Sequence, residues 1–310
     1  MDNWKTKTRK LIFALCAALV VILLILTGSS LYFLNEMFVR RVERMDYRPE
    51  DYDLPAESVS FTSPDVIPLQ AWLVKADDPR GIVVLLHGMD GQDASTVLGH
   101  ARFLHQAGYA SLVLDMRAHG RSGGQRIGLA FEEPGDAAAA LNWIEGQPEY
   151  TDLPRAVLGV SLGGATAIRT AAARPDVEAV ISVSAFGSVN MMIEDAFEMM
   201  MEAPTPVVKI FTPFIRLAFR ILYGVWPGKA SPLEDIPDIP PRPILIAHGD
   251  SDSQVSVANA YALAEAANGQ AELWIVEDAE HFIYKSDGTA PEDAFYRRQI
   301  LAFLNENLGD

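Results

Sequence analysis

The sequence has almost no cysteine, no excess of basic residues and no internal repeat. Its single cysteine, Cys16, makes an intramolecular disulfide framework impossible. Aspartate and glutamate number 41 against 25 lysines and arginines, so the net charge of -16 argues against a nucleic-acid partner. No cluster of histidine, aspartate and glutamate has metal-ligand spacing, and we expect neither a metal nor another cofactor. The 310 residues leave room for one large α/β domain and a membrane segment.

Charged residues are also absent from one long stretch near the N-terminus, residues 11–34. As a helix this stretch would be about 36 Å long, enough to cross a bilayer with some tilt. We predict a transmembrane anchor over residues 11–34, preceded by a basic tail over residues 1–10 and followed by a polar linker over residues 35–56. A cleaved signal peptide is the alternative, but the apolar core is long for a signal and no clear Ala-x-Ala site follows.

The orientation of this single-pass anchor depends on the basic residues that flank it. Arginines beyond the span balance the lysines and arginine of the tail, so the count alone favours neither side. The tail resembles the start of an export signal, and we therefore expect an extracytoplasmic domain.

Apolar and helix-forming segments alternate from residue 57 to residue 310. Expected strands lie at residues 59–62, 69–74, 81–86, 110–114, 155–158, 177–184, 243–247 and 271–276. Expected helices lie at residues 94–107, 133–145, 165–173 and 291–307. The first two strands read as an antiparallel pair, and the rest predict a mostly parallel, doubly wound sheet of the α/β class. Ligands of such sheets bind beyond the carboxyl ends of the strands.

One segment interrupts the alternation, at about residues 187–235. It is too long for a loop, so we expect a helical lid inserted between two strands. Its methionines and aromatic rings could form an adaptable acyl-binding wall, or could pack the lid onto the core; the candidates for substrate contact are Met191, Met192, Phe211 and Phe214. No acidic residue lies between residues 203 and 233, which suggests contact with the membrane; a solvated pair of arginines, Arg216 and Arg220, is the alternative.

A short apolar segment ends in the sequence Gly159-Val160-Ser161-Leu162-Gly163, and helix formers follow. A serine in a tight turn between strand and helix adopts a strained conformation, and glycines two residues away on each side relieve the crowding. This pattern predicts a nucleophile elbow with Ser161 as nucleophile and Gly159 and Gly163 as the elbow glycines. A glycine-rich turn whose serine only caps the helix is the alternative.

A serine hydroxyl needs a base to take its proton and an acid to orient that base. His281 follows the last expected strand and is our general base, since in this motif the acid and the histidine come after the serine. Asp250 and Asp252 both follow the strand before it. We take Asp252 as the acid and Asp250 as a turn former.

The negative oxygen that forms during acyl transfer needs two backbone donors. The amide of Leu162, directly after the nucleophile, is one candidate. The loop after the strand at residues 81–86 supplies the other, the amide of Met89.

Taken together, these motifs resemble those of the α/β-hydrolases, in the branch of monoglyceride lipases and serine aminopeptidase-like hydrolases. The matching pieces span about residues 57–308 and comprise residues 87–91, 115–122, 159–164, 248–252 with Val255, and 281–282. The resemblance implies that the aspartate of the His-Gly-x-x-Asp pattern is the triad acid, which supports Asp252. The chain departs from the pattern at Glu280, where relatives often carry glycine, and lacks His-Gly-Gly-Gly of the hormone-sensitive-lipase branch.

We therefore expect a membrane-tethered serine hydrolase that cleaves lipid-like or small carboxylic esters or thioesters through an acyl-enzyme. A serine peptidase or amidase with the same triad is one alternative. A catalytically inactive α/β-hydrolase that serves as a binding module is the other.

Overall fold

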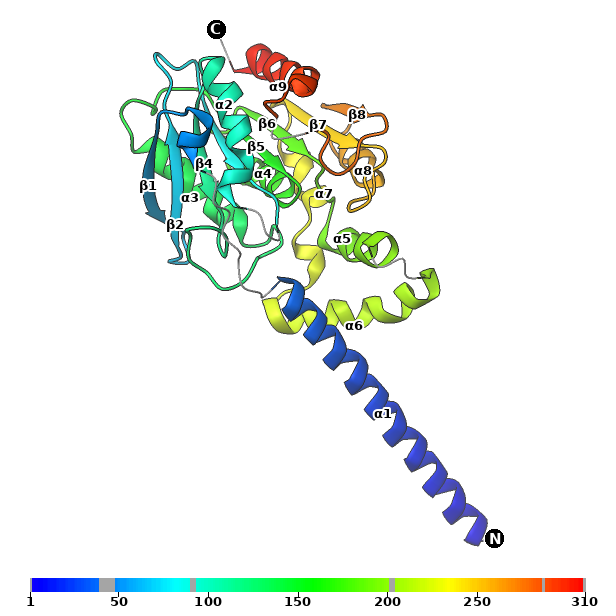
Figure 1. Cartoon of the computed structure of the whole chain (residues 1–310). Helices are drawn as coiled ribbons and strands as arrows, with labels where there is room; N and C mark the ends of the chain where they lie inside the picture. Colours follow the sequence, from blue (N-terminus) through cyan, green and yellow to red (C-terminus); the bar gives the residue numbers. More distant parts are fainter. Residues whose placement is uncertain (1, 39–47, 90–92, 201–203, 286–287, 309–310) are drawn as a thin grey trace.

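The computed structural model describes residues 2–38, 48–89, 93–200, 204–285 and 288–308, and these residues form an eight-stranded sheet between two layers of helices (Figure 1). The strand order is β1-β2-β4-β3-β5-β6-β7-β8. The strands are β1 (Ala56–Thr62), β2 (Pro68–Val74), β3 (Ile82–Leu86), β4 (Ala110–Asp115), β5 (Arg155–Val160), β6 (Ala179–Val183), β7 (Ile244–Gly249) and β8 (Ala271–Val276). The sequence prediction of eight strands is confirmed, with boundaries that differ by a few residues.

Two antiparallel pairings, β1 with β2 and β2 with β4, open the sheet, and every later pairing is parallel. Strands β3 to β7 are apolar at almost every position because helices cover both of their faces. Alternate residues of β3 show this: Val84 packs into the core on one face, and Val83 and Leu85 pack into the core on the other. The carboxyl ends of the parallel strands meet at one edge, where the candidate site lies.

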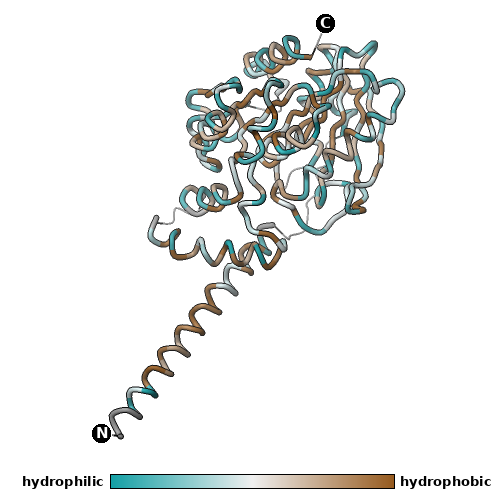
Figure 2. Tube along the Cα trace, turned by 180° about the vertical axis from the view of Figure 1, so that it is seen from behind, coloured by the Kyte–Doolittle hydropathy of each residue, from teal (hydrophilic) through white to brown (hydrophobic). Residues whose placement is uncertain are grey.

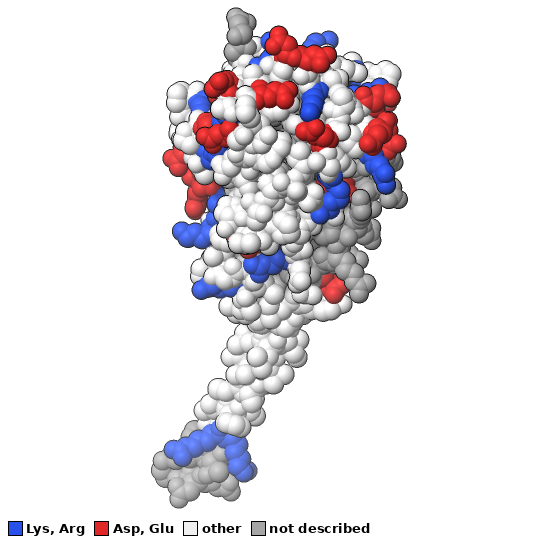
Figure 3. Space-filling view, turned by 90° about the vertical axis from the view of Figure 1, so that its left-hand side faces the viewer, with Lys and Arg blue, Asp and Glu red and all other residues white. Residues whose placement is uncertain are grey.

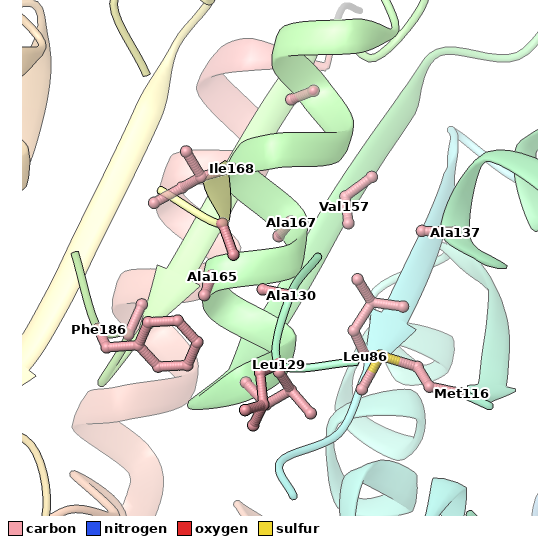
Figure 4. Packing of buried hydrophobic residues seen from close by; sticks show 14 of the residues in the cluster. Leu86, Met116, Leu129, Ala130, Ala137, Val157, Ala165, Ala167, Ile168 and Phe186 are labelled. Atoms are coloured by element: carbon pink, nitrogen blue, oxygen red, sulfur yellow. The ribbon is translucent and has the colours of Figure 1, made fainter. Parts of the chain in front are cut away.

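Helices α2 (Leu98–Gln106) and α9 (Ala294–Asn307) pack on one face of the sheet. Helices α3 (Glu133–Glu145), α4 (Leu162–Ala173) and α8 (Ala258–Ala266) pack on the other. Figure 4 shows the second face, with Ala165, Ala167 and Ile168 of α4 near Val157 of β5. Small side chains on α4 allow this helix to lie close to the strands that carry the site.

Two helices differ from the sequence expectation. The helix expected at residues 94–107 begins with a 3-10 turn, η2 (Ala94–Val97), because the Asp93 carboxylate caps the Ser95 amide at 2.9 Å. Helix α8 was not predicted at all. Its run of alanines, interrupted by polar residues, carries little periodicity.

Between β6 and β7 lies a helical insertion, residues 187–235. It contains α5 (Val189–Asp195), the π-helical turn η3 (Ala196–Met200), α6 (Thr205–Tyr223), the short turn η4 (Pro227–Lys229) and α7 (Pro232–Asp235). Short turns η1 (Pro49–Tyr52), η5 (Ile236–Asp238) and η6 (Pro291–Asp293) occur elsewhere.

Near the N-terminus, helix α1 (Asp2–Phe38) projects from the domain as one straight apolar rod (Figures 1 and 2). Residues 7–36 of this helix are long and apolar enough to cross a membrane. The helix is longer than the predicted span, and its last turn, residues 35–38, falls within the expected linker. Residues 39–47 of that linker lie outside the described residues.

Candidate active site

Ser161 lies at the turn between β5 and α4, where the backbone is forced into a conformation that side chains rarely adopt. Its φ is 57° and its ψ is -117°, and a non-glycine residue held there costs about 1–3 kcal/mol. A Cβ at position 159 would overlap the carbonyl of Gly163, and a Cβ at position 163 would overlap the carbonyl of Leu86. Glycine is therefore required at both positions for the helix to start so close to the strands, and Ser161 stands at the carboxyl edge of the sheet.

The loops after β7 and β8 bring a carboxylate and an imidazole together at the same edge. His281 Nδ1 lies 2.8 Å from Asp252 Oδ2, and both side chains are buried. The other carboxylate oxygen, Oδ1, accepts hydrogen bonds from the amides of Gln254 and Val255, at 2.8 and 2.9 Å. Burial opposes ionisation of Asp252, but the hydrogen bonds from His248 and His281 outweigh it and hold the pKa of this carboxyl well below its usual range. Asp252 is therefore an anion at neutral pH, fixed in orientation on both oxygens.

Strand β6 links this pair to the serine. The Ser161 amide donates to the Val183 carbonyl at 2.8 Å, and the hydroxyl of the next residue, Ser184, donates to the His281 carbonyl at 2.6 Å. Ser184 itself has a φ of 52°. The nucleophile turn and the histidine loop are thus anchored on two successive residues at the end of β6.

The loop after β3, which carries the expected oxyanion donor Met89, comes close to the first turn of α4. Gly163 lies so near the carbonyls of Leu86 and His87 that no side chain fits there. His87 braces this loop: its Nε2 accepts from the Met116 amide at 3.1 Å, so Nδ1 carries the proton and donates to the Gly88 carbonyl at 2.6 Å. Burial lowers the pKa of His87 to about 4, which keeps the ring neutral. Residues 90–91 of the matching motif lie outside the described residues.

Leu162 is the first residue of α4, and Met89 is half-buried against the core. An amide in the first turn of a helix has no partner within that helix and can donate to a ligand. The two expected donors therefore both lie at the carboxyl edge of the sheet, one at the start of α4 and one in the loop after β3.

One functional candidate was missed by the sequence analysis, His248 at the end of β7. Its ring is fully buried, and Nε2 lies 3.1 Å from Asp252 Oδ2 and 2.9 Å from the Val255 carbonyl. Since both neighbours are acceptors, Nε2 carries a proton and donates. The same carboxylate oxygen, Oδ2, thus accepts hydrogen bonds from two imidazoles, those of His248 and His281. The four-residue spacing of His248 and Asp252 was the available signal.

Glu280, the departure from the family pattern, ties the histidine loop to the acid loop. Its Oε2 accepts from the amide of Ser253 at 3.1 Å and from the Ser253 hydroxyl at 2.8 Å. Asp250, the other acid considered, is exposed and accepts from the Asp278 amide at 2.8 Å. Gly249 permits the close approach, since a Cβ there would overlap the Ala279 carbonyl. Hydrogen bonds therefore hold the loops after β7 and β8 together around the Asp252–His281 pair.

The substrate-contact candidates of the helical insertion lie in different surroundings. Met192 is buried, and Met191, Phe211 and Phe214 are half-buried. A cavity of about 300 Å³ opens between α5 and α6, and none of the four lines it; its walls are Glu194, Glu198, Val208, Lys209, Thr212, Pro213 and Arg216. Within the described ranges, no group of three or more histidine, cysteine, aspartate or glutamate side chains could hold a metal ion.

Residues 77–232 match the family model described as serine aminopeptidase, S33. Among curated proteins, the uncharacterized protein YqkD of Bacillus subtilis is 23% identical over 82% of this chain and 81% of its own length. The monoacylglycerol lipase of Mycolicibacterium smegmatis is 41% identical over 88 residues, which cover 28% of this chain and 31% of the lipase.

Solved structures share the fold. An esterase of Pyrococcus furiosus superposes with a TM-score of 0.67 at 21% identity, over 86% of this chain and 99% of the esterase. At this identity the likeness shows that the two chains have the same fold. The site must be argued from its own residues.

Proposed function

The chain belongs to the serine aminopeptidase S33 family of α/β-hydrolases, and from this premise we propose that it is a serine hydrolase that cleaves carboxylic esters or thioesters through an acyl-enzyme. The esterase fold and the monoacylglycerol lipase match make it esterase- and lipase-like at the level of the superfamily. The serine mechanism and the ester substrate are our proposal.

The observation that supports the mechanism best is the hydrogen bond between His281 and Asp252, together with its link to Ser161 through β6. His281 uses Nδ1 for the carboxylate, which leaves Nε2 for the serine hydroxyl. An ionised acid that binds Nδ1–H fixes the tautomer and the orientation of the ring, and stabilises the imidazolium that forms. Asp252, His281 and Ser161 then act as acid, base and nucleophile.

In the first half of the reaction, Ser161 Oγ attacks the carbonyl carbon of the ester while His281 Nε2 takes the hydroxyl proton. The carbonyl oxygen becomes an anion, held by the amides of Leu162 and Met89. When this intermediate collapses, the bond to the leaving group breaks and His281 gives its proton to the departing alcohol or thiol. In the second half, His281 deprotonates a water that attacks the acyl-enzyme, and the proton returns to Ser161 as the acid leaves.

A fluorophosphonate probe tests the nucleophile directly, because it forms a covalent bond only with an activated serine. We expect the folded protein to be labelled and Ser161→Ala to lose both labelling and esterase activity, the latter by at least about a thousandfold. Ser111→Ala is the matched control, since Ser111 is buried in β4 away from this edge. A folded wild type that resists the probe would instead favour the inactive binding module.

The family description also favours a second candidate, a serine peptidase or amidase with the same residues. Hydrolysis of p-nitrophenyl esters from acetate to palmitate, compared with aminoacyl p-nitroanilides, separates the two. We expect the esters to be cleaved with the higher kcat/KM. A preference for the anilides would assign the chain to the peptidases. The ester series also gives the acyl length that the lid accepts, where Met191, Met192, Phe211 and Phe214 are our proposed contacts.

We further propose that α1 is a retained membrane anchor and that the hydrolase domain is extracytoplasmic. In support, α1 is one unbroken helix from Asp2 to Phe38, and Ser30 and Leu34 near its end are buried where it meets the insertion. The mass of the membrane-bound protein tests retention, because cleavage after residues 27–30 would remove about a tenth of the chain. Alkaline phosphatase fused after residue 310 tests orientation; an inactive fusion would place the domain in the cytoplasm.

A further inference from the structure

The outer face of α6 is apolar, although it does not pack against the domain. The inner face, with Val208, Ile215 and Phe219, is buried in the core. On the outer face, exposed apolar side chains recur at helical spacings of three, seven and four residues, Val207, Ile210, Leu217 and Ile221, and Trp226 follows the helix end. Ile210 and Ile221 are each more than half exposed. A helix that is apolar on both faces normally has a nonaqueous neighbour on each side.

The segment that carries this stripe has a net charge opposite to that of the chain as a whole. No acidic residue lies from residue 203 to residue 233, whereas Lys209, Arg220 and Lys229 are exposed there. Figure 3 shows one face of the molecule: most acidic side chains lie on the half of the domain far from α1, interspersed with basic ones, and the half near α1 is largely uncharged, with a few basic groups and little acidic surface. A surface that is both apolar and basic has the chemistry that an anionic lipid layer binds.

The end of α1 determines where a bilayer would lie. Twenty helical residues cover about 30 Å, the thickness of the hydrocarbon core, so a span that starts at Leu11 ends near Leu31. At that level the surface of α1 changes from exposed to buried, as Ser30 and Leu34 pack into the domain. Helix α6 packs against α1 and crosses the rod near the end that meets the domain (Figures 1 and 2).

Aromatic residues mark the same level. Tyr32 on α1 and Trp226 after α6 are both largely exposed, and such rings favour the boundary between hydrocarbon and head groups. Lys7, Arg9 and Lys10 flank the other end of the span.

We propose that the stripe formed by Val207, Ile210, Leu217 and Ile221 lies in the surface layer of the membrane that α1 spans, with the bilayer lipids as its partner. The inference rests on the proposed anchor but not on the proposed hydrolysis. Its consequence is that α1 and α6 together fix the orientation of the domain, with the insertion rather than α9 facing the lipid. Esters dissolved in the membrane would then reach the site from the insertion side.

The single cysteine allows a direct test on the full chain in anionic lipid vesicles. An environment-sensitive fluorophore is attached at three positions in turn: native Cys16 in the span, Ile221→Cys in a Cys16→Ser background, and Phe295→Cys in the same background. Phe295 is the matched control because it is a similarly exposed apolar residue on α9, at the far end of the domain. Iodide reports contact with water, and nitroxide-labelled lipid reports contact with the bilayer.

We expect the labels at positions 16 and 221 to be quenched by nitroxide lipid and protected from iodide, and the label at 295 to show the reverse. A label at 221 that iodide quenches as fully as the one at 295 would overturn the inference and leave the anchor intact. Protection at 221 from both quenchers would mean that protein, such as a second copy, covers the stripe. A label at 16 that is open to iodide would overturn both the anchor and the docking surface. Fluorophosphonate labelling of the same samples reports the proposed chemistry independently.

Discussion

The carboxyl edge of the sheet and the helical insertion are held in place by different forces. At the edge, buried polar groups are joined by short hydrogen bonds, and backbones approach so closely that only glycine fits at positions 159, 163 and 249. In the insertion, α6 is held mainly by apolar side chains and by α1. Hydrogen bonds and steric limits define one geometry, whereas apolar packing tolerates many side chains of similar volume.

This difference suggests that the edge and the insertion have different roles. Reaction chemistry needs atoms held to within a fraction of an ångström, and the edge provides this rigidity. Adaptation to a substrate or a membrane needs a surface that can change, and the insertion provides that. Changes at the edge should therefore cost much more than comparable changes in the insertion.

The largest contrast is expected from one added methyl group in each region. Gly159→Ala places a Cβ into the carbonyl of Gly163, so the turn cannot form without displacing α4, and we expect a loss of at least about 3 kcal/mol of stability or a failure to fold. Gly228→Ala in the insertion meets only the Asn190 side chain, at 3.7 Å. Urea unfolding of both variants measures the difference. Equal stabilities would show that the edge is less constrained than its geometry indicates.

The features that make the edge rigid also leave a clear signal in the sequence. A turn that accepts only glycine beside a strained serine leaves a short, recognisable pattern around Ser161. Strands buried on both faces leave continuous apolar runs such as residues 81–86. The order of Ser161, Asp252 and His281 along the chain then follows from the order of the strands.

What the sequence did not predict depends on contacts between distant segments. The docking of α1 on α6 joins residues nearly two hundred positions apart, and nothing in either helix alone specifies the other. The second imidazole on Asp252 required knowledge of how the loop after β7 folds back. Helix α8 was missed because its alanines give no marked apolar face.

The joint between the two regions is the loop at residues 127–128, to which Tyr223 and Glu133 are hydrogen-bonded. We expect the stability of the protein to depend on pH through this joint. Tyr223 of α6 donates to the Ile127 carbonyl at 2.8 Å, and Glu133 holds the same loop by accepting from the Gly128 amide at 2.5 Å. Burial, reinforced by Asp136, raises the pKa of Glu133 from 4.5 to about 7, against the opposing effect of Arg117. Between those pH values the folded chain binds the extra proton, so this group lowers stability as pH rises through the window, by up to about 3 kcal/mol above pH 7.

Glu133→Gln keeps the acceptor and cannot ionise. We expect the variant to match the wild type near pH 4.5 and to gain stability progressively up to pH 7 and above, as measured by thermal unfolding across that range. Glu145→Gln, on the same helix but exposed, is the control and should change little at any pH. If both variants followed the wild-type pH profile, Glu133 would not be the group that weakens the joint.

A smaller effect, on kcat, is expected from substitution of His248 within the edge. This ring donates to Asp252 Oδ2 at 3.1 Å but belongs to none of the three proposed reacting groups. His248 is therefore a positioning residue. Without the proton that His248 donates, the Asp252 carboxylate can rotate, and the ring of His281 loses part of its alignment. We expect His248→Ala to lower kcat about tenfold to a hundredfold with little change in KM. His248→Gln, which retains an N–H donor, should recover much of the loss.

Ester hydrolysis and thermal unfolding of both His248 variants, measured beside His105→Ala, separate positioning from stability. His105 is a half-buried histidine whose Nδ1 is hydrogen-bonded to the Lys75 carbonyl at 2.7 Å, away from the edge. A purely structural role for His248 would lower the melting temperature of the alanine variant and leave kcat per folded molecule unchanged. A kcat per folded molecule that falls with alanine and returns with glutamine would instead show that the orientation of Asp252, more than its presence, limits the reaction, because glutamine restores an N–H donor to the carboxylate.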